Sequence, residues 1–86
     1  MKPTRSDFRI VKVTNGKIFI EDLNLGHLSV TNDAEAVVDS VCDWAKSVGG
    51  ETDPRIIYRD SDGKWDELAH TGGAFTGFLP YNEELP

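Results

Sequence analysis

The sequence predicts a single small α+β domain in which one helix packs on one face of an antiparallel sheet, in the order β-β-α-β-β-β. Three observations lead to this class. They are an Asn15-Gly16 turn between two strand-like runs, a helical repeat of apolar residues, and two glycine-containing turns that join three later runs. With 86 residues, the chain can bury one core and is too short for two.

The first two strand-like runs form a β-hairpin. Residues 8–14 and 17–22 flank Asn15-Gly16, a pair that tolerates the two positive φ angles of a type I′ turn. A two-residue loop fixes which side chains share a face. It pairs Val13 with Ile18, Val11 with Ile20 and Arg9 with Asp22 on the predicted core face, and Ile10 with Glu21 and Lys12 with Phe19 on the other.

The middle of the chain is predicted to be a helix at about 32–48. Thr31 or Asn32 can cap its start, and Gly49-Gly50 supplies a left-handed stop. For residues 23–30 the sequence indicates a turn at 25–28 that leads into a short edge strand. The helix is predicted from apolar residues that recur at three-and-four spacing, namely Ala34, Val37, Val38, Val41, Ala45 and Val48.

Three further runs, residues 55–59, 64–70 and 75–79, predict an antiparallel meander joined by Asp62-Gly63 and Gly72-Gly73. Two-residue loops would pair Arg59 with Asp66, Ile57 with Leu68, His70 with Phe75 and Leu68 with Gly77. One face of the meander then carries Ile57, Leu68, His70, Phe75 and Leu79. The other carries Ile56, Tyr58, Trp65, Glu67, Ala69, Thr76 and Phe78.

The second of these faces is predicted to be a protein-contact surface. One helix covers one side of a sheet, and an uncovered side normally alternates with polar residues, which this one does not. Aromatic side chains are enriched at protein interfaces. We therefore expect contacts with another protein at Ile56, Tyr58, Trp65, Glu67 and Phe78, unless the first hairpin packs over the same side chains.

The ends and the composition predict a cytoplasmic domain. Residues 1–7 and 81–86 are polar and are expected to be flexible tails, the last of them acidic, around a domain at 8–80. Cys42 is the single cysteine, and no charged-plus-apolar leader opens the chain. Apolar runs stay far below the roughly 20 residues that cross a bilayer, so no membrane partner is expected.

The charge distribution points to a protein partner, or to a second copy, and away from nucleic acid. Fifteen acidic and nine basic side chains give a net charge of −6. Residues 1–17 hold five basic side chains and one acid, whereas the rest of the chain holds four basic and fourteen acidic side chains. Because the acidic part also contains the surplus aromatic residues, direct nucleic-acid binding is not expected.

An acidic row on the predicted helix offers a second interpretation. Glu35, Asp39 and Asp43 stand four residues apart, which gives a rise of about 6 Å between neighbouring charges. This spacing is comparable with that of phosphates along a nucleic-acid strand. The row therefore predicts either a solvated face or an acidic nucleic-acid mimic that binds a basic DNA-handling protein.

Metal and cofactor sites are not predicted. The acidic run at 60–67 fails as a calcium loop, because placing Gly63 at the sixth position puts Tyr58 at the first and Ala69 at the twelfth. His27, Cys42 and His70 lack the close spacing of zinc ligands. The glycines at 71–77 lack the lysine and the following helix of a phosphate-binding loop.

Two long runs, residues 22–38 and 55–70 together with Phe75-Thr76-Gly77-Phe78, resemble small uncharacterised proteins of proteobacteria and their phages. The likeness covers about residues 18–80. It implies an accessory or phage-linked cytoplasmic protein that acts on a host protein, and it implies no catalytic residues.

The sequence thus predicts a non-enzymatic, acidic protein-binding module or homodimer that needs no cofactor. The acidic mimic is the first alternative. A small hydrolase built around His70 is the second, and it requires a carboxylate or Cys42 within hydrogen-bonding reach of the imidazole.

Overall fold

The computed structural model describes residues 3–24, 28, 31–60 and 62–83, with the backbone alone for residues 31 and 32. The predicted α+β class and the element order are confirmed, and a short 3₁₀ turn precedes the first strand. The elements are η1 (Arg5–Asp7), β1 (Phe8–Thr14), β2 (Lys17–Asp22), α1 (Thr31–Gly49), β3 (Arg55–Arg59), β4 (Trp65–Thr71) and β5 (Ala74–Pro80).

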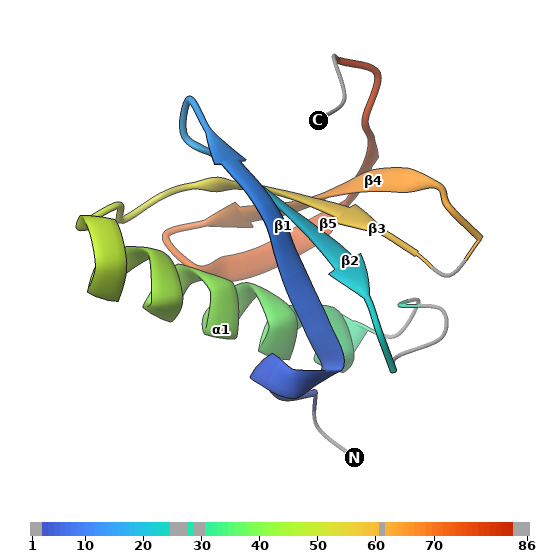
Figure 1. The fold of residues 1–86 in the computed structure, drawn as a ribbon, viewed down its shortest axis with the longest axis horizontal. Helices are drawn as coiled ribbons and strands as arrows, with labels where there is room; N and C mark the ends of the chain where they lie inside the picture. Colours follow the sequence, from blue (N-terminus) through green and yellow to red (C-terminus); the bar gives the residue numbers. More distant parts are fainter. Residues whose placement is uncertain (1–2, 25–27, 29–30, 61, 84–86) are drawn as a thin grey trace.

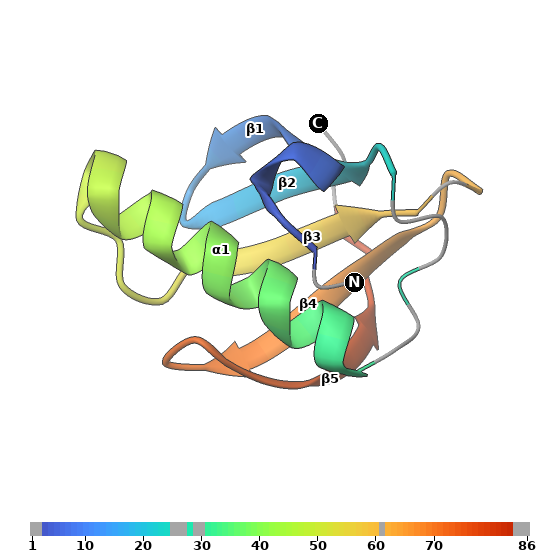
Figure 2. The same cartoon turned by 90° about the horizontal axis from the view of Figure 1, so that it is seen from below.

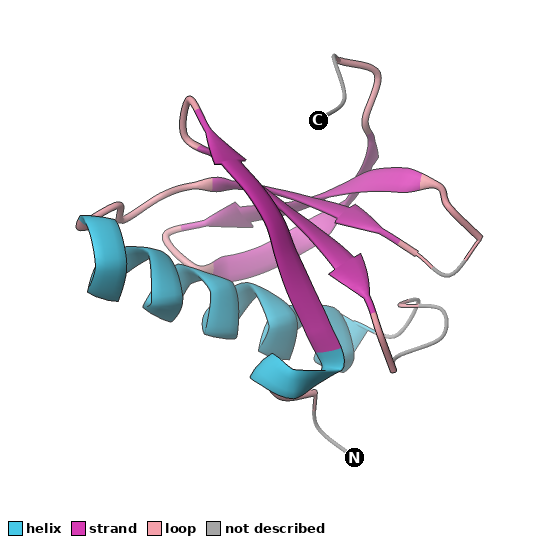
Figure 3. Cartoon of the chain, viewed as in Figure 1, coloured by secondary structure: helices cyan, strands magenta, loops and turns pink. Residues whose placement is uncertain are grey.

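The strands form one sheet in chain order, β1-β2-β3-β4-β5, and α1 lies on one face of it (Figures 1, 2 and 3). The sheet is mixed, whereas the sequence predicted an antiparallel one. β2 and β3 are parallel, and the other three pairs are antiparallel. The physical reason is the connection through α1, because a helical crossover carries the chain from the end of β2 back to the end of the sheet where β2 began, and β3 starts there.

The β1–β2 hairpin turns at Asn15 and Gly16, whose φ angles of 49° and 76° suit the predicted type I′ turn. The predicted pairs Val13–Ile18 and Lys12–Phe19 are confirmed. Beyond them a bulge at Val11 shifts the register by one residue. The predicted pairs that lie past the bulge are therefore wrong: Arg9 lies opposite Glu21 and Ile10 opposite Ile20, in place of Arg9–Asp22, Val11–Ile20 and Ile10–Glu21.

The helix extends one residue beyond the predicted range at each end. At its C-terminus Gly50 adopts a left-handed φ of 69° and donates its backbone N–H to the Lys46 carbonyl over 3.1 Å, as the Gly49-Gly50 stop predicted. The predicted caps at Thr31 and Asn32 concern side chains outside the described part of the structure. The predicted turn at 25–28 also lies outside it, apart from Leu28, which is buried.

The β3–β4 register differs from the prediction by one residue. Ile56 lies opposite Leu68 and Arg59 opposite Trp65, because the loop contains five residues instead of two. Buried Asp60 organises this loop, since its Oδ1 accepts backbone N–H bonds from Asp62 at 2.9 Å and Lys64 at 3.0 Å. Because side chains alternate along a strand, a one-residue shift moves every side chain of β4 to the other face of the sheet relative to the side chains of β3.

The β4–β5 hairpin turns at Gly72 and Gly73, as predicted, and the pair His70–Phe75 is confirmed. A bulge at Thr76 then makes Phe78, and not Gly77, the partner of Leu68.

The sheet has a core on both faces. The larger cluster lies between α1 and the sheet. It contains residues of α1, of strands β1 to β4 and of the segment before the helix: Phe8, Ile18, Ile20, Leu28, Ala34, Val37, Val38, Val41, Ala45, Ile56, Tyr58 and Leu68. The smaller cluster lies on the face without a helix and consists of Phe19, Ile57 and Tyr81, with Trp65 packed against it.

Two valines in α1 test this division of the helix. Val38 is 0 % exposed, whereas Val48 is 63 % exposed. Val38→Ala is expected to lower the free energy of unfolding by about 2 kcal/mol, because two methyl groups leave the core. Val48→Ala, the identical substitution, should change it by less than about 0.5 kcal/mol, since alanine favours the helix and little burial is lost. Urea unfolding followed by tryptophan fluorescence measures both, and equal losses would contradict the assigned burial.

Candidate functional site

The five predicted contact residues do not share one surface. Ile56 and Tyr58 are 0 % and 2 % exposed and lie in the core beneath α1. Trp65 and Glu67 alternate onto the helix-free face, and Phe78 lies on the helix side of β5. The predicted surface is thus corrected. The predicted register put Ile56 and Trp65 on one face, and the observed register between β3 and β4 differs from it by one residue, which places them on opposite faces.

Three aromatic rings pack together on the helix-free face. The Phe19 ring lies edge-to-face against Trp65, with centroids 5.6 Å apart, and against Tyr81, with centroids 5.8 Å apart. Tyr81 comes from the segment that follows β5, which lies on the side of the sheet away from α1 (Figure 1). The C-terminal segment and Trp65 therefore cover apolar residues on this face, as the helix covers those on the other face.

One ion-pair group stands beside Trp65. Glu21 binds the guanidinium groups of Arg9 and Arg59 at its two carboxylate oxygens, and Arg59 also lies 5.3 Å from the centroid of the Trp65 ring. Burial opposes ionisation of Glu21, but the bonds and charges of the two arginines outweigh it and lower the pKa of this carboxyl. The indole of Trp65 is held between an aromatic edge and a cation.

A second ion-pair group fastens the C-terminal segment. Glu83 receives Lys17 Nζ at 2.9 Å and Arg55 Nη2 at 2.6 Å, and Arg55 also forms two bonds to Glu67, at 2.7 and 3.1 Å. These bonds, Arg55 first and Lys17 second, lower the pKa of Glu83 to about 2. Residues 81–83 fall in the predicted tail at 81–86, and the ring of Tyr81 and the carboxylate of Glu83 attach them to the sheet.

Residues 3–7, which fall in the predicted tail at 1–7, also form hydrogen bonds that attach them to the domain. The Asp7 carboxylate accepts a bond from Thr4 N at 2.8 Å, which closes η1. The Asp7 carbonyl accepts bonds from the backbone N–H groups of Leu23 and Asn24, at 3.0 and 3.1 Å. Residues 3–7 thus pack against the chain that leaves β2.

The fold gathers positive charge on the helix-free face of an acidic chain. Strand alternation assigns five basic and two acidic side chains to this face, and the ion pairs of Glu83 add a third acid, although the whole chain carries −6. The sequence interpretation had separated the basic N-terminal residues from the aromatic ones. The structure places Lys17 over the ring of Tyr81, and Glu21 joins Arg9 to Arg59, which lies over the ring of Trp65. The rings of Phe19 and Tyr81 are buried, however, so they offer no surface on which bases could stack.

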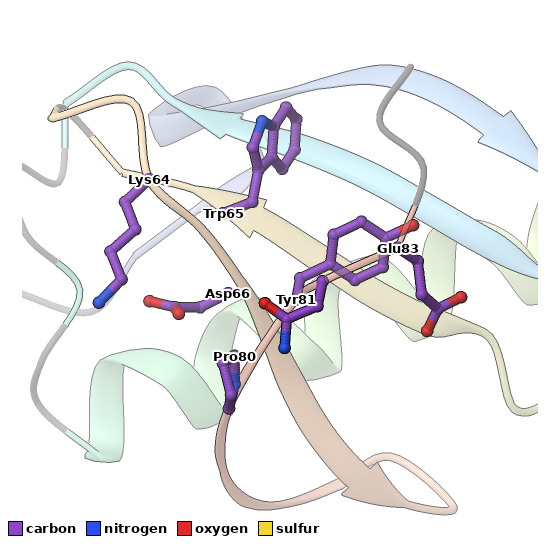
Figure 4. A pocket seen from close by; sticks show the side chains of 7 residues that line it. Lys64, Trp65, Asp66, Pro80, Tyr81 and Glu83 are labelled. Carbon is purple, nitrogen blue, oxygen red and sulfur yellow. The ribbon is translucent and has the colours of Figure 1, made fainter.

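A shallow open cleft of about 360 Å³ lies where β4 begins and β5 ends (Figure 4). Trp65 and Tyr81 form its apolar part, and Lys64 and Asp66 form its polar rim. The remaining lining residues are Pro80, Asn82 and Glu83.

Across the part of the chain that the structure describes, no group of three or more His, Cys, Asp or Glu side chains is arranged to hold a metal ion.

His70 has a structural environment. Its Nε2 bonds to the Pro54 carbonyl at 2.5 Å, and its Nδ1 accepts the Gly73 backbone N–H at 3.1 Å. Asp53 Oδ1 lies 3.5 Å from the same Nδ1. Both ring nitrogens are therefore used to fix the start of β3 and the β4–β5 turn, and the hydrolase interpretation has no free nitrogen here to act as a base. His27 lies outside the described residues.

Cys42 lies on the flank of α1 that faces the β4–β5 turn. Burial first, and then the charges of Asp39, Asp53 and Asp43, raise the pKa of its thiol to about 11. A thiol with this pKa is protonated at neutral pH, so it is not an activated nucleophile.

The acidic row of Glu35, Asp39 and Asp43 is exposed, and its binding to a DNA-handling protein stays a prediction.

The outer strand β5 is the most apolar exposed element of the described chain. Its seven residues carry no charge, and two large side chains, Phe78 and Leu79, are 39 % and 51 % exposed. The opposite edge strand, β1, carries Arg9 and Lys12. The uncharged run at 74–80 was visible in the sequence, but only the order of the strands shows that this run is an edge.

No protein-family model, curated protein or solved structure matches the chain. The resemblance to phage-associated proteins therefore stays a prediction. Among the described residues, no helix is both long and apolar enough to cross a membrane.

The ion pairs of Glu83 predict a pH dependence of stability. The pKa of Glu83 falls from an ordinary 4.5 to about 2 on folding. A carboxyl with a lowered folded-state pKa contributes stability above about pH 4.5, and this contribution disappears as the pH falls through about 2. Glu83→Gln should therefore be less stable than the parent at pH 7, and the difference should shrink steadily between pH 4.5 and 2.

Urea unfolding at a series of pH values measures this difference. Asp62→Asn, at an exposed position in the β3–β4 loop, removes the same charge and serves as the control. A Glu83→Gln profile that runs parallel to the parent profile over this range would show that the C-terminal segment is not held by these ion pairs.

Proposed function

We propose that this protein is a non-enzymatic protein-binding module whose contact site is the edge of β5. The observation that carries the proposal is an uncharged outer strand that exposes Phe78 and Leu79 on a chain in which more than a quarter of the residues are charged. Exposed backbone N–H and C=O groups of an edge strand pair readily with an extended segment of another protein.

The shape of β5 limits the contact to a short stretch. A bulge at Thr76 and the proline at position 80 are devices that shield edge strands, and they bracket residues 77–79. Side chains in this stretch point to both faces. Leu79 lies on the helix-free face opposite Glu67, and Phe78 lies on the helix side opposite Leu68.

The residues around Leu79 extend the proposed contact surface beyond β5. Leu79 is followed by Pro80 and Tyr81, which line the cleft with Trp65. The charge of Glu67, which lies opposite Leu79, is taken up by Arg55, so a partner that covers Leu79 leaves no unpaired carboxylate beneath it. An added strand on β5 therefore has an apolar anchor on each face of the sheet and a cleft at its end.

The opposite edge offers a matched control. Leu79 on β5 and Val13 on β1 are 51 % and 53 % exposed, and both are aliphatic. β1 carries Arg9 and Lys12, and charges of this kind discourage strand pairing. A contact at β5 should thus respond to a change at Leu79 and not to the equivalent change at Val13.

A phage-displayed library of nine-residue peptides, selected on the immobilised chain, tests the proposal. The selected peptides are expected to bind Leu79→Gln about tenfold more weakly than the parent, because the buried area of one aliphatic side chain is lost. They should bind Val13→Gln as tightly as the parent. Hydrogen exchange should show new protection in residues 74–79 when peptide is bound.

Two results would contradict the proposal. One is an enriched set of peptides that is sensitive to Val13→Gln and insensitive to Leu79→Gln. The other is a library that yields no binder above the background of an unrelated immobilised protein. The melting temperatures of both variants are measured alongside, so that a folding defect is not counted as lost binding.

A further inference from the structure

The surroundings of β5 indicate which kind of strand it binds. Glu35, Asp39 and Asp43 are exposed and lie on one flank of α1, because residues four apart in a helix are neighbours on its surface. The structure shows where this flank points. Asp39 and Asp43 line a second open cleft together with Gly72 and Gly73, the two residues that precede β5.

The helix crosses the sheet obliquely, and the flank with Asp39 and Asp43 faces the β4–β5 turn. Figure 2 shows α1 crossing the sheet from the side of β5, with β1 at the far edge. A strand added outside β5 would therefore have these carboxylates on its helix side, nearest to the β4–β5 turn. Its side chains on the helix side would meet the carboxylates, and those on the opposite side would meet Leu79.

The field beside this edge is negative. Asp53 adds a third carboxylate to the lining of the second cleft, and Lys46 is the one basic residue among the described residues that line it. The thiol of Cys42, which lies in the same lining, responds to this field, since its pKa is raised by burial and then by all three carboxylates.

This negative field argues against a second copy of the chain at β5. A symmetric pair would place the same strand edge against itself, so the two acidic flanks would come together across the two-fold axis. Each copy also carries a net charge of −6. Like charges placed opposite one another disfavour such a contact.

We infer that the segment bound at β5 is an extended basic peptide, with Lys or Arg on the alternate positions that face α1 and apolar residues on the positions that face Leu79. The inference rests on the proposed function and adds the chemistry of the partner to it. Charge complementarity with Glu35, Asp39 and Asp43 selects the basic positions, and the uncharged strand itself accepts the backbone.

The experiment uses three synthetic peptides of the pattern Thr-X-Val-X-Val-X-Thr, in which X is Lys, Gln or Glu. Binding to the full chain is measured by fluorescence anisotropy at 50 and 300 mM salt. The Lys peptide is expected to bind at least about tenfold more tightly than the Glu peptide at low salt, and high salt should reduce this preference.

Two double variants with the same net charge locate the effect. Asp39→Asn with Asp43→Asn should weaken binding of the Lys peptide about fivefold and leave the Gln peptide unchanged. Asp33→Asn with Asp62→Asn should leave both unchanged, because Asp33 lies about 200° around the helix from Glu35 and Asp62 lies in the β3–β4 loop.

The possible outcomes separate the two proposals. If the three peptides bind equally and all are lost with Leu79→Gln, the partner chemistry is wrong and the β5 contact stands. If none binds at millimolar concentration, both are wrong. A Lys preference that both double variants reduce equally would reflect net charge alone and would overturn the inference, as would a concentration-dependent dimer that protects β5 without peptide.

Discussion

The parallel pairing of β2 with β3 is the contact on which the rest of the structure depends. It joins two segments that α1 separates in the chain, and the Gly16 carbonyl fixes its register by accepting the Arg55 N–H at 2.8 Å. The pairing sets Ile20 beside Tyr58 under the helix and Phe19 beside Ile57 on the opposite face. Without it the hairpin and the meander would be two small units, and neither would have a core of useful size.

Each face of the sheet is covered in a different way, and this leaves one edge open. The helix buries one face with aliphatic residues. On the other face a few aromatic rings and two groups of ion pairs cover the apolar residues of the central strands, and the C-terminal segment completes the cover. Among the strands, the large apolar residues that neither cover reaches lie on β1 and β5, and on β5 no charge accompanies them. The proposed contact site is thus apolar surface that stays exposed after both faces of the sheet have been covered.

The sequence was informative wherever a local rule determined the structure. Asn15-Gly16 and Gly72-Gly73 are turns because glycine and asparagine accept positive φ angles at little cost. The helix follows from the spacing of its valines and alanines. The register errors at Val11, at Thr76 and in the β3–β4 loop arose from one extra residue in a strand or a few extra in a loop. Periodicity does not show such residues, and each one exchanges the faces of a strand.

For the candidate site, the sequence by itself determined the composition of each piece: an acidic flank on the helix, an uncharged final strand, and aromatic residues in the second half of the chain. Only the tertiary structure decided that Ile56 and Tyr58 are core, that Glu83 reaches both Lys17 and Arg55, and that the acidic flank faces the β4–β5 turn. The physical reason is the range of the interactions. Turns and helices depend on neighbours in the chain, whereas strand order, ion pairs and exposed edges depend on which distant segments the crossover brings together.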